Sequence, residues 1–286
     1  MANSDVQLKQ FLRSLKHRLN GGSTLVETER ALDKWTILTC QALNFERRDI
    51  VDFALNLLHE VYEGYLANPI AGQELTQKRL AVVVRLYVLG SLAVRLDDWQ
   101  TLRSIVLRPA KIHQLDTNYV HSSWIRHGHV EAARAGLTKT DDDNGAYLIA
   151  ASRELLATEP TMHPDVPSGL VPRSGSADDV LLNTLCQFDI LYCILVAIDG
   201  PTSVKSMYPS SSAFDEARAD PALVRVCQDK TVRSALFPDT DDPTIAAATY
   251  NVVRMAMQEA LAFGGRWWGP PPSVQAFLTA NGQQEA

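Results

Sequence analysis

Apolar residues recur along the chain every three or four positions, which is the period of an α-helix. The clearest stripe contains four leucines near the N-terminus, Leu8, Leu12, Leu15 and Leu19. A second helix is expected from residue 25, because Thr24 and Glu27 form the Thr-x-x-Glu pattern that caps helix N-termini. The same periodicity predicts further helices over these ranges: 50–67, 73–96, 99–107, 117–136, 144–158, 177–198, 214–227, 231–237, 243–263 and 273–278.

Polar residues, glycines and prolines mark where these helices begin and end. Asp49 is expected to cap the helix that begins at residue 50, and Pro109 is expected to follow the end of another. The small residues Gly90, Ser91 and Ala93 would let a second helix approach closely. Because no segment alternates apolar and polar residues over a convincing length, the ten to twelve expected helices predict an all-α fold, either a multi-helix bundle or stacked helical hairpins.

Residues 168–176 read Ser-Gly-Leu-Val-Pro-Arg-Ser-Gly-Ser, which is typical of a flexible connection rather than a helix. Within this segment, residues 170–173 resemble the thrombin-cleavage tetrapeptide that is inserted into recombinant proteins. We interpret the segment as an engineered linker; the alternative is a natural loop of the same sequence. The linker divides the chain into two helical parts, 1–167 and 177–286, which we expect to share one core.

The composition fits a soluble globular protein and excludes wholesale disorder, since 46% of the 286 residues are hydrophobic, 21% are charged and the net charge is −6. None of the four cysteines forms a Cys-x-x-Cys pair, which argues against a thiolate zinc site and for reduced thiols in the cytoplasm. Residues 1–20 lack the uninterrupted apolar core of a secretory signal. The most apolar stretch, 180–198, contains Asn183, Gln187 and Asp189, so we expect a buried helix there rather than a membrane span.

The chain contains none of the motifs that would identify an enzyme or a cofactor site. It has no Gly-rich phosphate loop and no Gly-x-Ser-x-Gly elbow. On a helix, the spacing of His121, His127 and His129 does not let them face one metal ion, so we expect structural or surface histidines. The acidic run 141–143 lacks the ligand spacing of an EF-hand and is interpreted as a solvated turn. We expect no metal and no cofactor, and a non-enzymatic role is favoured over catalysis.

Asp189 is the only carboxylate inside a long apolar run, and a buried carboxylate must be paired or protonated. It is therefore either half of a structural pair or an acid–base group in a ligand pocket inside the helical bundle. The residues expected to line such a pocket are Asp189, Tyr192, Trp124 and His127. Trp124 and His127 fall on one helical face, for which packing is the simpler role.

The best candidate for a protein-binding segment lies near the C-terminus. Arg266, Trp267 and Trp268 precede three consecutive prolines, and Trp and Arg are enriched at interface hot spots. A stiff proline run would present these side chains to a partner. The alternative is a loop that packs back and seals the end of the bundle.

Basic residues form one face of the first predicted helix. Lys9, Arg13 and Lys16 share that face, and basic faces contact the phosphates of nucleic acids. The overall acidity of the chain favours a solvated face beside the leucine stripe instead. The leucines themselves would also serve as a dimer contact.

Two resemblances to known families add to these expectations. Residues 88–93, followed by Asp97-Asp98-Trp99 and Leu102, resemble a tetratricopeptide hairpin, and the pattern does not recur at the ~34-residue spacing of true repeats. Three motifs resemble helical regions of bacterial multidomain proteins that carry a Schlafen-like, AlbA-type domain: 92–95, 185–189 and 222–225. The chain shows no such α/β domain, so this resemblance implies the helical module alone.

Together these features predict a non-enzymatic helical interaction or regulatory module that acts through protein–protein contacts or self-association, in a bacterial regulatory or defence assembly. The first alternative is a small-molecule sensor or enzyme with a pocket inside the bundle. The second alternative is nucleic-acid binding through the basic N-terminal helix.

Overall fold

The structure, a computed structural model, describes residues 2–19, 23–66, 73–107, 109–110, 122–123, 177–199, 218–263 and 269–283. Within these residues the protein is all-α, as the apolar periodicity predicts, and contains ten helices. Two short strands, β1 (Pro109–Ala110) and β2 (Ser122–Ser123), form one antiparallel pair.

The described helices form two groups, one before and one after the predicted linker. The first group is α1 (Ala2–Leu19), α2 (Leu25–Asn44), α3 (Arg48–Leu66), α4 (Gln73–Arg95) and α5 (Trp99–Leu107). The second group is α8 (Ala177–Asp199), α10 (Asp220–Gln228), α11 (Lys230–Leu236), α12 (Asp242–Phe263) and α13 (Pro272–Ala280).

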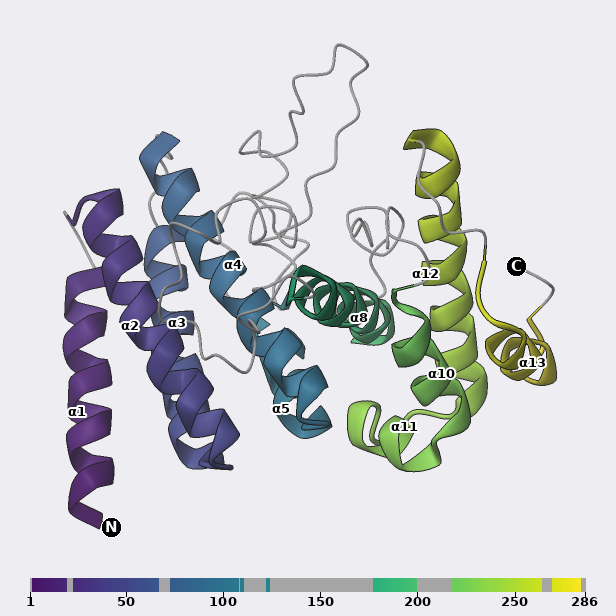
Figure 1. The fold of residues 1–286 in the computed structure, drawn as a ribbon, viewed down its shortest axis with the longest axis horizontal. Coiled ribbons are helices and arrows are strands. Elements are labelled where there is room, and N and C mark those ends of the chain that lie inside the picture. The colour runs from purple at the N-terminus through teal and green to yellow at the C-terminus, as the bar shows by residue number, and fades with distance from the viewer. Residues whose placement is uncertain are drawn as a thin grey trace.

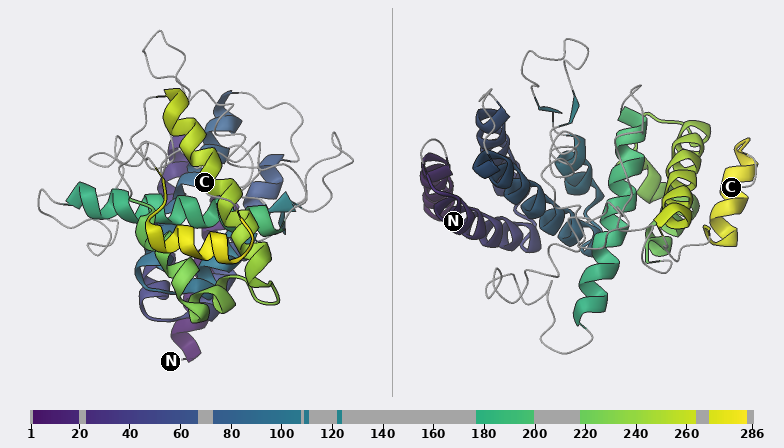
Figure 2. Two further views of the ribbon diagram at one scale, coloured as in Figure 1. Left: turned by 90° about the vertical axis from the view of Figure 1, so that its right-hand side faces the viewer. Right: turned by 90° about the horizontal axis from the view of Figure 1, so that it is seen from above.

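The helices are stacked approximately in chain order, from α1 at one end of an elongated molecule to α13 at the other (Figure 1, Figure 2). In the first group, α1 packs on α2 and α3, and α4 packs on α2, α3 and α5. Helix α8 crosses between the groups, because it contacts α4 and α5 on one side and α10 and α12 on the other. Helix α13 packs on α10 and α12. Each helix therefore contacts mainly its neighbours along the stack.

A single hydrophobic cluster runs through the stack and includes side chains from both groups of helices. Leu12 of α1, Leu86 of α4, Leu191 of α8 and Val252 of α12 are all completely buried in it. The described helices on the two sides of residues 168–176 therefore share one core. The segment 168–176 itself lies outside the described residues.

Local sequence rules account for the first two helices. Leu12, Leu15 and Leu19 are buried, so the N-terminal leucine stripe is the inner face of α1. At the start of α2, the Thr24 N–H donates to Glu27 Oε2 at 2.8 Å, and the Glu27 N–H donates to Thr24 Oγ1 at 3.3 Å. These two hydrogen bonds are the predicted capping box.

The structure corrects two predicted helix starts. Helix α3 begins at Arg48, so Asp49 lies in its first turn, where it pairs with Lys9 instead of capping the helix. Helix α10 begins at Asp220 rather than at residue 214, because Pro221 has no N–H and is favoured in the first turn of a helix. Residues 214–217 lie outside the described residues.

The prediction of a helix over 117–136 is wrong at Ser122 and Ser123, which pair with Ala110 and Pro109 as strand β2. Serine is a weaker helix former than alanine or leucine, and its hydroxyl competes for backbone hydrogen bonds. Pro109 cannot continue α5, which ends at Leu107 as predicted. The rest of this range and the helix predicted over 144–158 lie outside the described residues.

Candidate functional site

Asp189 lies on α8 near the middle of the stack. The helix is apolar around nearly its whole circumference, so it is buried between the two groups of helices, as predicted for this stretch. Asp189 is completely buried, and the Tyr87 hydroxyl of α4 donates a hydrogen bond of 3.0 Å to its Oδ1. Tyr87 therefore supplies part of the pairing that a buried carboxylate requires.

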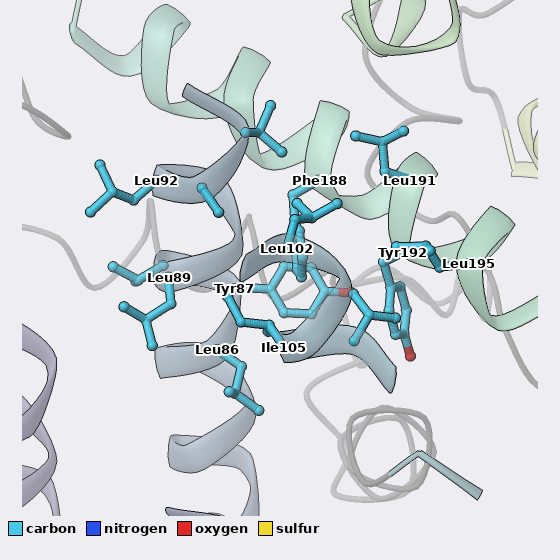
Figure 3. Close-up of a cluster of buried hydrophobic side chains, with 14 of the residues drawn as sticks. Leu86, Tyr87, Leu89, Leu92, Leu102, Ile105, Phe188, Leu191, Tyr192 and Leu195 are labelled. Carbon is cyan, nitrogen blue, oxygen red and sulfur yellow. The ribbon is translucent and has the colours of Figure 1, made fainter. Parts of the chain in front are cut away.

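Aromatic and aliphatic side chains surround Tyr87, the donor of this hydrogen bond (Figure 3). The Tyr87 ring meets Phe188 edge to face at 4.9 Å between centroids, and it lies 6.1 Å from the Tyr192 ring. Leu102 and Ile105 of α5 are completely buried in the same cluster. The structure thus brings Asp189 and Tyr192 into one cluster with Tyr87, which is not among the residues predicted to line the pocket. No local pattern marks Tyr87, because it is 102 residues away from its partner.

Burial determines the protonation of Tyr87 and of three buried cysteines. Desolvation raises the pKa of the Tyr87 hydroxyl well above its ordinary value, and the Asp189 carboxylate raises it further. The same two causes, in the same order, raise the pKa of the Cys193 thiol. Burial also raises the pKa of Cys40 and of Cys227 to about 12. Tyr87 therefore stays a hydrogen-bond donor at neutral pH, and these three cysteines stay protonated and unsuited to nucleophilic catalysis.

Gly90 lets α4 and α8 approach closely beside this cluster. A Cβ atom at position 90 would overlap the ring of Phe188, so no larger residue fits without movement of that ring or of the helices. The prediction that small residues near the end of α4 permit close packing is confirmed at Gly90. The tight contact and the Tyr87–Asp189 hydrogen bond together fix how α4 crosses α8.

The remaining candidate residues lie outside the described residues. They are two residues of the expected pocket and the three residues of the expected protein-binding segment: Trp124, His127, Arg266, Trp267 and Trp268. The pocket and the binding segment therefore stay predictions.

The basic residues of α1 face α3 and are engaged by it. Lys9 Nζ lies 3.1 Å from Asp49 Oδ2, the Arg13 guanidinium lies 5.2 Å from the centre of the Phe53 ring, and Lys16 forms an ion pair with Glu60. These contacts hold α1 on the stack and offset part of the positive charge that a nucleic acid would need. The geometry therefore does not favour the nucleic-acid alternative.

A shallow cavity of about 300 Å³ lies at the turn between α11 and α12. Lys230, Arg233, Asp239 and Asp242 are among its lining residues. The Arg233 Nε donates to Asp242 Oδ1 at 2.9 Å, and Arg233 Nη1 donates to the backbone carbonyls of α10. The lining is of mixed charge and its arginine is already paired, so the cavity indicates no particular class of ligand.

One helix turn occurs twice in the first group of helices. In the turn between α2 and α3, Glu46 has a φ of 55°, and the Arg47 N–H donates to the Ala42 carbonyl at 2.8 Å. In the turn between α4 and α5, Asp97 has a φ of 55°, and the Asp98 N–H donates to the Ala93 carbonyl at 2.9 Å. Both helices therefore end in the same Schellman motif, in which a left-handed residue reverses the chain.

The sequence carries a signal for this repetition, at a spacing longer than the ~34 residues of tetratricopeptide repeats. Residues 42–46 read Ala-Leu-Asn-Phe-Glu and residues 93–97 read Ala-Val-Arg-Leu-Asp. Each run is a small residue, an aliphatic residue, a polar residue, a large apolar residue and an acid. The offset from Phe45 to Leu96 is 51 residues, because the two hairpins contain long helices.

The two turns lie side by side and expose apolar side chains. Phe45 is 76% exposed and Leu96 is 41% exposed, at equivalent positions of the repeated motif. Arg48 links the turns by donating to Gln100 Oε1 at 2.6 Å and to Asp98 Oδ1 at 3.4 Å. We call residues 45–48 and 96–100 together the turn edge. It lies on the lower side of the stack in Figure 1.

Within the described ranges, no helix is long and apolar enough to cross a membrane, and no group of three or more His, Cys, Asp or Glu side chains is placed to hold a metal ion. No known protein family, curated protein or solved structure matches the chain.

Proposed function

We propose that the protein is a helical interaction module that binds a protein partner through the turn edge. The observation that carries this proposal is the exposure of Phe45 and Leu96 at equivalent positions of two adjacent turns. Transfer of such side chains from water into an interface is favourable by roughly 25 cal/mol for each Å² of apolar surface buried. Large aromatic side chains are also the usual anchors of protein interfaces.

The architecture supports this role. Stacked helical hairpins use their helix faces for the core and present their turns in a row along an open edge. In this protein the interior of the first group is filled by packed side chains such as Leu32, Leu55 and Leu86, all completely buried. The proposal that the module works in a bacterial regulatory or defence assembly rests on the resemblances of its helical motifs alone.

The experiment that tests the proposal compares a turn-edge variant with a control variant in affinity capture from the organism that encodes the protein. One variant carries Phe45→Asp and Leu96→Asp, and the control carries Val26→Asp. Val26 is also more than half exposed, but it lies at the other end of α2, about 28 Å away at 1.5 Å per residue.

We expect partners captured by the wild-type chain to be lost with the turn-edge variant and kept with the Val26 variant. Circular dichroism must show that both variants keep the helical fold. Equal capture by all three proteins would contradict a role for the turn edge.

A small-molecule sensor or enzyme is the second candidate function, because a completely buried carboxylate lies beside two tyrosines on α4 and α8. Native mass spectrometry of the purified full chain tests it. Extra mass that is retained by the wild type and lost in Asp189→Asn would favour a ligand at this cluster. A bare protein mass supports the interaction module, and the same spectrum gives the subunit count.

A further inference from the structure

We propose that the partner segment that docks on the turn edge is an amphipathic helix with an arginine or lysine beside its apolar side chains, and that this cation binds Glu46. The inference rests on the proposed function and names the chemistry of the partner. The protein itself contains a model of this contact, one hairpin further along the stack.

That internal contact is made by α10 on the second turn of the turn edge. Arg225 of α10 forms an ion pair with Asp97, the left-handed residue of this turn. The Arg225 guanidinium also lies 5.6 Å from the centre of the Trp99 ring, a cation–π distance. The second turn therefore already binds an arginine that is presented by a helix, through its acidic left-handed residue.

The first turn offers the equivalent acid to a partner from outside. Glu46 has the same φ as Asp97 and lies in the same hydrogen-bonded motif. Its side chain is exposed and has no ion pair with any residue that the structure describes. By the repeat, a basic side chain on a second helix would reach Glu46 as Arg225 reaches Asp97.

The other charges of the turn edge are already matched within the chain. Arg47 lies 2.8 Å from Asp5 and 3.7 Å from Asp49, and Arg48 binds Asp98. Glu46 is thus the carboxylate left open beside the exposed Phe45 ring. An apolar side chain for the ring and a cation for the carboxylate are what an amphipathic basic helix presents together.

The test uses two fluorescein-labelled synthetic helices with the same leucine face. One has arginine on its polar face and the other has glutamate. Fluorescence anisotropy measures their binding to the full chain and to four variants: Glu46→Gln, Glu29→Gln, Phe45→Ala and Val26→Ala. Glu29 and Val26 lie near the start of α2, at the opposite end of the helix. Glu29→Gln therefore repeats the loss of one negative charge, and Val26→Ala truncates another exposed apolar side chain.

We expect the arginine helix to bind at least about tenfold more tightly than the glutamate helix. Glu46→Gln should weaken the arginine helix at least about fivefold and leave the glutamate helix unchanged. Phe45→Ala should weaken the arginine helix, and the Glu29 and Val26 controls should not. Because Glu46→Gln and Glu29→Gln alter the net charge equally, a difference between them reports on the site and not on the overall charge.

Three results would overturn the inference: no binding of the arginine helix, equal binding of both helices, or equal effects of Glu46→Gln and Glu29→Gln. If Phe45→Ala still weakens binding while Glu46→Gln does not, the turn edge remains a docking surface and only the basic character of the partner is wrong. If Phe45→Ala also has no effect, the proposed function fails as well.

Discussion

A buried carboxylate is tolerated where hydrogen-bond donors replace the water that it has lost, and at Asp189 one donor is the Tyr87 hydroxyl. Tyr87→Phe keeps the ring and removes this donor. We expect the free energy of unfolding to fall by about 1–3 kcal/mol in urea denaturation. The control is Tyr250→Phe at a partly buried position of α12, where the change should stay within about 0.5 kcal/mol. A similar loss in both variants would show that the hydrogen bond has no special weight.

Buried acids also make the stability depend on alkaline pH. In the folded protein, burial raises the pKa of Cys40 and of Tyr65 to about 12, whereas their ordinary values are 9.0 and 10.0. The unfolded chain therefore loses these protons first as the pH rises, and the stability that is present below pH 9 declines above it. Each such group lowers the free energy of unfolding by about 1.4 kcal/mol for each pH unit between its unfolded-state pKa and its folded-state pKa.

Urea denaturation at a series of pH values from neutral to alkaline measures this decline. Cys40→Ala removes one of the buried acids, so its stability should fall less steeply with pH than that of the wild type, whatever its stability at neutral pH. A slope that is identical in both proteins would contradict the assignment to Cys40.

At the level of helices, the contact between α4 and α8 depends on the absence of a side chain at Gly90. We expect Gly90→Ala to lower the free energy of unfolding by about 1–3 kcal/mol, because overlap with Phe188 outweighs the better helix propensity of alanine. Gly64→Ala in α3 is the matched control, since nothing lies within 4 Å of the added atom. It should be neutral or stabilise by up to about 1 kcal/mol in the same denaturation measurement. A gain at both positions would show that the two helices can separate at little cost.

The same contact shows how far local sequence signals reach. The small residues of α4 predict a close contact with another helix, and the contact at Gly90 confirms this prediction. The sequence of α4 does not indicate that Phe188 is the residue in contact. Likewise, the start of α2 follows from the capping box and the end of α5 follows from Pro109, because both signals act within a turn of the helix end. The repeated Schellman turn escaped prediction because its two copies lie 51 residues apart, beyond the ~34-residue spacing of tetratricopeptide repeats.

At the scale of the whole molecule, the sequence predicts that the chain is helical, but it does not predict how the helices are arranged in the stack. The charged face of α1 is evident from the spacing of Lys9 and Arg13, yet its cover by Phe53 depends on which helix packs beside it. The pairing of Tyr87 with Asp189 depends in the same way on how two distant helices cross. The sequence therefore predicts which types of residue a candidate site contains, whereas the packing of the helices determines which residues lie next to them.

The shared core gives a direct prediction for the intact chain and its cleaved form. Residues 170–173 predict thrombin cleavage after Arg173, which would divide the chain between the two groups of helices. Because α8 buries Phe188 and Leu191 in the same cluster as α4 and α5, the fragments should remain associated. Denaturing mass spectrometry should then show two fragments where native mass spectrometry shows one complex.

Two variants decide what holds the fragments together. Arg173→Ala should leave the chain uncut and so identify the cleavage position. Phe188→Asp places a second carboxylate in the contact between α4 and α8, where an unpaired buried charge is strongly unfavourable, so its cleaved fragments should separate. Separation of the wild-type fragments would contradict the shared core, whereas an uncut wild-type chain would contradict the interpretation of residues 168–176 as a protease-sensitive linker. Retention of both fragments in the wild type and their loss in Phe188→Asp would assign the association to α8, the helix through which the two groups form one molecule.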